Sequence, residues 1–151
     1  MARFVARLDA PVPAGRVWDR LVDWPAHGQG VPLTTVRVLT PSGAGVGARF
    51  VGRTGIGPLG FDDPMEVVEW RPPTDAVPGF CRVEKLGRIV LGGAWFEVAP
   101  TGPGSCRVTW TEDIEIVPVR LTRPLAPLVA VVGRLAFTRV LRQAVARAGR
   151  D

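Results

Sequence analysis

The order of the predicted elements constrains the fold of this chain more than any single motif. Residues 3–8 alternate polar and apolar side chains with a period of two, which predicts an opening strand that ends before Pro11. Residues 16–22 then place their apolar side chains on one face of a short helix. Pro25 predicts that this helix ends at Trp24, because the residue before a proline avoids helical backbone angles.

Six further strands are expected before a closing helix. They span residues 34–40, 47–54, 65–70, 79–86, 89–99 and 107–117. Glycine and proline between residues 101 and 105 predict a hairpin turn that joins the last two strands. The closing helix is predicted to begin near Pro124; it is apolar on every side from Leu125 to Val132 and amphipathic from Arg134 onward.

This succession of elements resembles the START-like SRPBCC superfamily, which includes polyketide cyclase/dehydrase-type and birch-pollen-allergen-like proteins. The pieces that carry the resemblance are Phe4–Trp24, Gly45–Phe50, Val67–Pro73, Cys106–Glu112 and the terminal helix. It implies one α+β domain over residues 1–151 with a helix-grip fold: a curved antiparallel sheet of about seven strands wrapped around a long C-terminal helix, with an apolar cavity between them. None of the matching pieces is a catalytic motif, so the resemblance implies a fold and a cavity rather than a reaction.

The size and cysteine content fit one domain that needs no disulfide. The chain has 151 residues, of which 46% are hydrophobic, enough for a core of its own. Cys81 and Cys106 match no zinc-ligand spacing, and we expect both to be buried small side chains. Residues 1–3 lead directly into a strand without a signal-peptide apolar run, and no uninterrupted apolar run reaches 18 residues. We therefore expect a cytoplasmic bacterial protein.

The positive charge is concentrated at the C-terminal end. The net charge is +5, and residues 120–150 hold seven arginines and no acidic residue. A partner attracted by charge would meet the face of Arg139 and Arg142, and an acyl-carrier protein or an anionic membrane surface would fit. Alternatively, these arginines only keep the outer face of the helix soluble. Nucleic acid is not expected, because aromatic residues do not alternate with the basic ones. The oligomeric state, monomer or homodimer, stays open.

Several common chemistries lack the residues they need. Residues 43–48 match the dinucleotide pattern Gly-x-Gly-x-x-Ala, but a predicted strand follows them instead of a helix. The two serines, Ser42 and Ser105, and the single histidine, His27, lie in separate turn or loop segments, which does not predict a catalytic triad. We expect no metal site and no cofactor, and we interpret His27 as a solvated loop residue or a pH-sensitive lid contact.

Glu112 is the strongest candidate for acid-base chemistry. It shares a strand face with Val108, Trp110 and Ile114, so the pattern points a carboxylate at the cavity. Burial would raise its pKa and make it a candidate general acid or base. Alternatively, Glu112 pairs with an arginine or lies at the wetter end of the strand. The inward face of residues 79–86 is ambiguous; if Arg82 points inward, it lies beside Glu112 and can polarise a ligand carbonyl.

The remaining inward-facing residues form the predicted ligand-binding wall. They are Phe50, Thr54, Met65, Val67, Phe96, Val108, Trp110, Leu128 and Val132. Two functions are compatible with such a cavity. The first is a cyclase/dehydrase-type enzyme that acts on a polyketide-like substrate without cofactor or metal, using Glu112 for proton transfer. The second is a non-catalytic carrier for a lipid, an isoprenoid quinone or another apolar metabolite.

Overall fold

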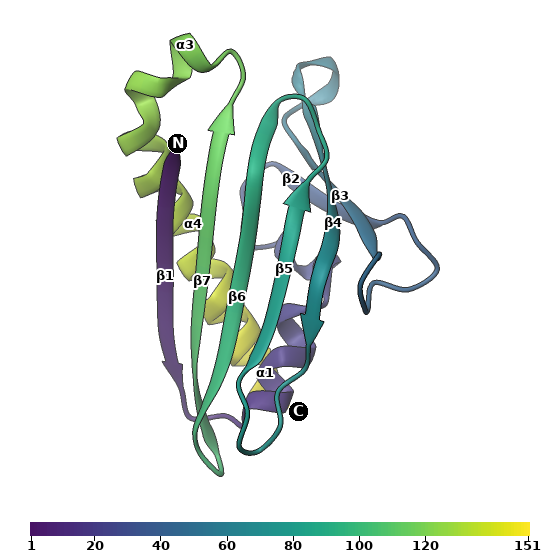
Figure 1. Cartoon of the computed structure of the whole chain (residues 1–151), viewed down its shortest axis with the longest axis vertical. Helices are drawn as coiled ribbons and strands as arrows, with labels where there is room; N and C mark the ends of the chain where they lie inside the picture. The colour runs from purple at the N-terminus through teal and green to yellow at the C-terminus, as the bar shows by residue number, and fades with distance from the viewer.

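A computed structural model describes residues 1–151 and shows one antiparallel sheet with helices on one of its faces (Figure 1). The strands are β1 (Ala2–Ala10), β2 (Thr34–Val38), β3 (Arg49–Thr54), β4 (Phe61–Arg71), β5 (Gly79–Lys85), β6 (Val90–Gly102) and β7 (Ser105–Ile116). The helices are α1 (Ala14–Leu21), α2 (Trp24–His27), α3 (Val119–Thr122) and α4 (Ala126–Ala148), with short 3-10 turns η1 (Gly57–Leu59) and η2 (Arg123–Leu125).

The seven strands follow the order β1-β7-β6-β5-β4-β3-β2. Consecutive strands are neighbours except for β1, which pairs with the last strand, β7, in a register that places Phe4 opposite Glu112. Helix α4 crosses one face of the sheet, and α1 lies on the same side (Figure 1). This arrangement confirms the predicted α+β helix-grip fold.

The alternation of side chains along each strand determines which face the helices cover. In β7, every second side chain is buried, and the side chains between them are mostly more exposed. The buried ones are Cys106, Val108, Trp110, Glu112 and Ile114. The same period of two runs along β1. A half-buried antiparallel sheet requires this pattern, which is why the sequence predicted these strands well.

Packing of α4 on the sheet differs between its two halves. In the second half, Leu141, Ala144 and Ala148 are buried in the main core. In the first half, Gly133 lets the helix approach β1, since a Cβ atom there would lie only 2.4 Å from Cε1 of Phe4. Most side chains of α4 between Ala126 and Gly133 are exposed or only partly buried.

The segment around Trp24 corrects two predictions. The first helix ends at Leu21, and Trp24 opens α2 instead of closing α1, with Pro25 in the first turn, where a proline is tolerated. His27, expected in a solvated loop, lies on α2 and is buried. The indole of Trp24 stacks on Phe50 and donates a hydrogen bond of 2.8 Å to the Gly43 carbonyl, which holds α2 against β3.

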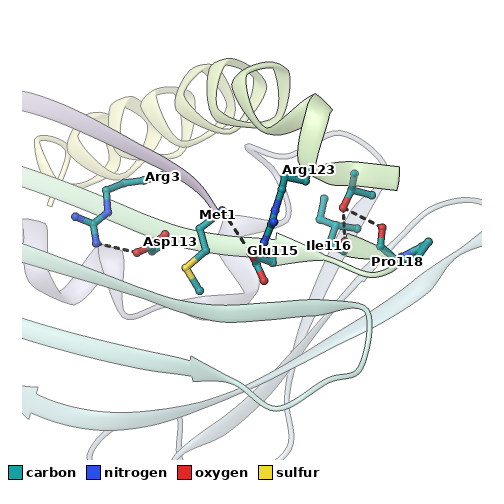
Figure 2. A network of polar contacts seen from close by, with 8 residues as sticks. Met1, Arg3, Asp113, Glu115, Ile116, Pro118 and Arg123 are labelled. Atoms are coloured by element: carbon teal, nitrogen blue, oxygen red, sulfur yellow. Dashed lines mark hydrogen bonds and ion pairs between the residues drawn. The ribbon is translucent and has the colours of Figure 1, made fainter. Parts of the chain in front are cut away.

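Polar contacts hold the beginning of the C-terminal helical segment against β7 (Figure 2). Glu115 lies 3.3 Å from the amino group of Met1 and 3.9 Å from Arg123. The hydroxyl of Thr122 donates to the carbonyl oxygens of Ile116 and Pro118. These contacts fix α3 at one end of the sheet.

Both cysteines are buried and free, as predicted. Burial raises the pKa of the Cys81 thiol to about 12 and that of Cys106 to about 11. Neither thiol is therefore reactive near neutral pH.

Candidate ligand cavity

A cavity of about 470 Å³ lies between the first half of α4 and the sheet. Of its 26 lining residues, 18 are hydrophobic. The volume falls in the range typical of small-molecule sites, roughly 300–1,000 Å³. The site can therefore enclose an apolar ligand of ordinary metabolite size.

Six of the nine residues predicted as the ligand-binding wall line this cavity. They are Phe50, Thr54, Met65, Trp110, Leu128 and Val132. That they contact a ligand stays a prediction.

Val67, Phe96 and Val108 do not line the cavity, although all three face inward and are fully buried. The ring of Phe96 shows the reason: it is covered by Trp18 of α1, with centroids 5.4 Å apart, and stacked on Trp110 at 5.2 Å. Aromatic side chains fill this part of the fold, and strand alternation cannot distinguish a filled layer from a hollow one.

Glu112 lies in the cavity wall, where the strand pattern placed it. Its side chain is only 4% exposed, and Nε1 of Trp110 donates a hydrogen bond of 3.2 Å to its Oε1. Burial raises the pKa of Glu112, while the positive charge of Lys85 and the Trp110 hydrogen bond partly oppose this effect. Glu112 therefore retains its proton at a higher pH than an exposed glutamate.

Arg82 does not lie beside Glu112, contrary to the prediction. Cys81 and Val83 occupy the inner face of β5, so Arg82 points outward. It lies 3.4 Å from Glu69 and stacks over Trp95 on the outer surface, with 5.3 Å between the guanidinium carbon and the ring centroid.

Lys85 is the cation that faces the cavity. It is the only lysine in the sequence, and it continues the inner face of β5 after Cys81 and Val83. The side chain is 6% exposed, and Nζ donates a hydrogen bond of 2.6 Å to Oδ2 of Asp63. Burial alone would lower the pKa of Lys85, but the charges of Glu112 and Asp63 raise it, so the ammonium is retained.

Asp63 completes a polar cluster of three side chains from β4, β5 and β7. Its Oδ1 is buried without a hydrogen-bond partner. The sequence did not predict this residue because Pro64 follows it, and proline inside a strand argues against a strand at that position. The strand nevertheless begins at Phe61, which places Asp63 in the cavity wall. We refer to Asp63, Lys85 and Glu112 as the polar cluster.

His27 contributes another polar group to the cavity lining. Its Nε2 lies 2.7 Å from the carbonyl oxygen of Leu21, and because a carbonyl only accepts, Nε2 carries the proton and Nδ1 is left as an acceptor. Burial lowers the pKa of His27, which keeps the ring neutral. The ring packs edge-on against Trp110, with centroids 5.5 Å apart, so one indole contacts both His27 and Glu112.

The sequence matches no protein-family model and no curated protein. Solved structures match over nearly the whole chain. A protein from Thermus thermophilus has a TM-score of 0.76 at 16% identity, with 98% of this chain and 97% of that one covered. The Zhui aromatase/cyclase of Streptomyces sp. R1128 has a TM-score of 0.66 at 15% identity, with 94% and 92% covered. Human STARD10 has a TM-score of 0.71 at 12% identity, with 98% of this chain and 64% of that one covered.

Proposed function

Because the chain has the START/SRPBCC-like helix-grip fold, we propose that it binds an apolar small molecule with at least one carbonyl oxygen in the cavity beneath α4. The apolar lining favours a hydrocarbon or aromatic body. The polar cluster favours one hydrogen-bonding oxygen at a defined place on that body.

The observation that carries this proposal is the state of Glu112. Its carboxyl group is buried and its one hydrogen bond comes from Trp110. Since burial favours the protonated form, the acid O–H has no acceptor from the protein at that position. A carbonyl oxygen of a bound ligand would accept this hydrogen bond.

The same arrangement supports cyclase-type chemistry. Glu112 would protonate a ligand carbonyl oxygen while the enol form of a second carbonyl group of the same ligand forms a carbon–carbon bond to that carbonyl carbon. The enol hydroxyl becomes a carbonyl in this step, and the proton it loses would return to the carboxylate of Glu112, which restores the acid. The ammonium of Lys85, held by Asp63, would stabilise negative charge that develops on the oxygen. The resemblance to an aromatase/cyclase structure supports this proposal.

A carrier without turnover is the second candidate. One observation favours it: the ammonium of Lys85 is already paired with Asp63, so its charge is partly neutralised before any negative charge develops on a ligand. A carrier needs only a hydrogen-bond donor that fixes the orientation of its cargo.

Binding of two matched probes tests the proposal. 2-Acetylnaphthalene and 2-ethylnaphthalene have nearly the same shape, and only the first carries a carbonyl. A net hydrogen bond contributes about 0.5–1.5 kcal/mol, so wild type should prefer the ketone by roughly two- to tenfold. The preference should fall as the pH rises through the raised pKa of Glu112.

Two variants test whether the hydrogen-bond donor or the charge of Glu112 determines the preference for the ketone. Glu112→Gln retains an N–H donor that does not titrate near neutral pH, so its ketone preference should not change with pH. Glu112→Leu removes the donor and should bind the two probes equally. Failure of wild type to bind either probe would contradict the binding function, and equal binding at every pH would contradict the role of Glu112.

A further inference from the structure

Four large apolar side chains on the C-terminal helical segment are exposed and do not belong to the ligand cavity. They are Leu121, Leu125, Val131 and Leu135, and we call them the apolar helix surface. Leu121 is 73% exposed and Leu135 is 68% exposed. Because none of the four lines the cavity, the ligand site does not account for their exposure. Large apolar patches on a soluble protein usually mark an interaction site.

The charge around this surface has one sign. Arg120, Arg123 and Arg134 are exposed along the same segment, and residues 116–150 contain no aspartate or glutamate. The nearest acid in sequence, Glu115, is already shared between the amino group of Met1 and Arg123 (Figure 2). The surface therefore combines exposed leucines with positive charge that no acid in the segment neutralises.

This combination distinguishes between the candidate partners. A second copy docked about a two-fold axis would place the same arginines against each other without an acid to pair them. An acidic carrier protein would use the arginines but gives no reason for the exposed leucines. An anionic bilayer accommodates both, since leucines enter the acyl boundary while arginines remain at the headgroups. We propose that the apolar helix surface docks the protein on an anionic lipid membrane.

A second group of exposed apolar side chains lies at the same end of the molecule as α3. The turn between β3 and β4 carries Ile56 and Leu59, and Leu59 is 89% exposed. Figure 1 shows this turn and α3 at the same end of the sheet. Leu128 and Val132 line the cavity and are themselves more than half exposed, so the cavity is open beside α4 near this end. Docking would bring the cavity opening close to the lipid.

The helical segment lies on the membrane in this proposal and does not cross it. By length and composition, Val119–Ala148 could span a bilayer. Its second half, however, is buried in the main core through Leu141 and Ala144, and it carries three more arginines. Extracting that half would expose the core.

Vesicle flotation measures the docking directly. The full-length protein is mixed with vesicles of phosphatidylcholine and phosphatidylglycerol at a 3:1 ratio, or of phosphatidylcholine alone, at low and moderate salt. We expect binding to the anionic vesicles that weakens with salt. Arg120→Gln/Arg134→Gln should reduce that binding by about fivefold for each arginine, since each contributes about 1 kcal/mol near an anionic surface.

Leu125→Glu/Leu135→Glu should abolish binding, and both positions are exposed enough for the fold to tolerate the change. The matched controls lie on the outer face of the sheet: Val5→Glu/Leu91→Glu for the apolar residues and Arg7→Gln/Arg37→Gln for the charge. Both controls should bind like wild type.

Three results would overturn the proposal. The first is absence of wild-type binding to anionic vesicles at low salt. The second is equal loss in the variants and in their matched controls. The third is a concentration-dependent dimer in sedimentation velocity that Leu125→Glu/Leu135→Glu dissociates, because the apolar helix surface would then be covered by a second copy.

Discussion

A larger side chain in the cavity wall should stabilise the protein and weaken ligand binding at the same time. Gly52 lies on the cavity face of β3. A Cβ atom there would meet only Cε of Met65 at 3.9 Å and the carbonyl oxygen of Asp63 at 4.0 Å. Both are ordinary van der Waals contacts, so Gly52→Leu can place its side chain in the cavity without moving the backbone.

Two contributions set the expected gain in stability. Replacing a glycine inside a strand contributes about 0.5–1 kcal/mol through backbone entropy. Burying the four added carbons contributes about 0.8 kcal/mol each if they are fully enclosed, and about half of that in an open cavity. The sum is about 2 kcal/mol, which raises Tm by roughly 4–8 °C for a chain of this size. Four carbons of about 30 Å³ each would also fill about a quarter of the cavity.

The assay combines thermal unfolding with binding of the neutral fluorescent probe N-phenyl-1-naphthylamine. Gly52→Leu should raise Tm and weaken probe binding by at least tenfold. Val51→Leu, on the opposite face of the same strand, should leave binding unchanged. A stabilised Gly52→Leu variant that binds the probe as well as wild type does would show that the probe lies outside this cavity. A strongly destabilised variant would refute the geometry of the wall.

Five further predictions concern the polar residues. Lys85→Met should destabilise the fold by about 3–5 kcal/mol in chemical denaturation, because Asp63 is left buried and unpaired, and Lys85→Met/Asp63→Asn should recover part of that loss. The pKa of Glu112 is higher in the folded protein than its value of about 4.3 in the unfolded chain. This difference stabilises the fold below the unfolded-state pKa, and the stabilisation is lost as the pH rises through the folded-state pKa. Glu112→Gln should therefore make the free energy of unfolding less dependent on pH over this range. If the protein is a cyclase, Glu112→Gln should also lower turnover of a linear polyketone at least tenfold with little change in affinity. Arg82→Ala should change neither probe affinity nor turnover, because Arg82 points away from the cavity. His27→Phe removes the Nδ1 acceptor and should weaken 2-naphthol binding more than naphthalene binding, as isothermal titration can show.

The sequence predicted those features that depend on local periodicity. The strands, their inward faces in β3 and β7, and the position of Glu112 all follow from a period of two and were recovered. The ambiguous strand was β5, where both faces carry apolar residues. Extending the Cys81-Val83 alternation by one step would have placed Lys85 in the wall, and Arg82 outside it.

Features that depend on tertiary packing were not predicted. Phe96 faces inward, but only the fold shows that Trp18 and Trp110 fill the space around it. Asp63 was missed because Pro64 weakens the local strand signal while the neighbouring strands still pair around it. His27 was missed because burial of a four-residue helix is decided by its contacts rather than by its own sequence.

The structure of a complex with 2-acetylnaphthalene would show whether Glu112 binds the ligand oxygen inside the cavity. We expect the rings to lie between α4 and the sheet, with the ketone oxygen within about 3.2 Å of a carboxyl oxygen of Glu112. A ligand bound outside the cavity, or one inside it with its oxygen turned away from the polar cluster, would rule out this binding mode.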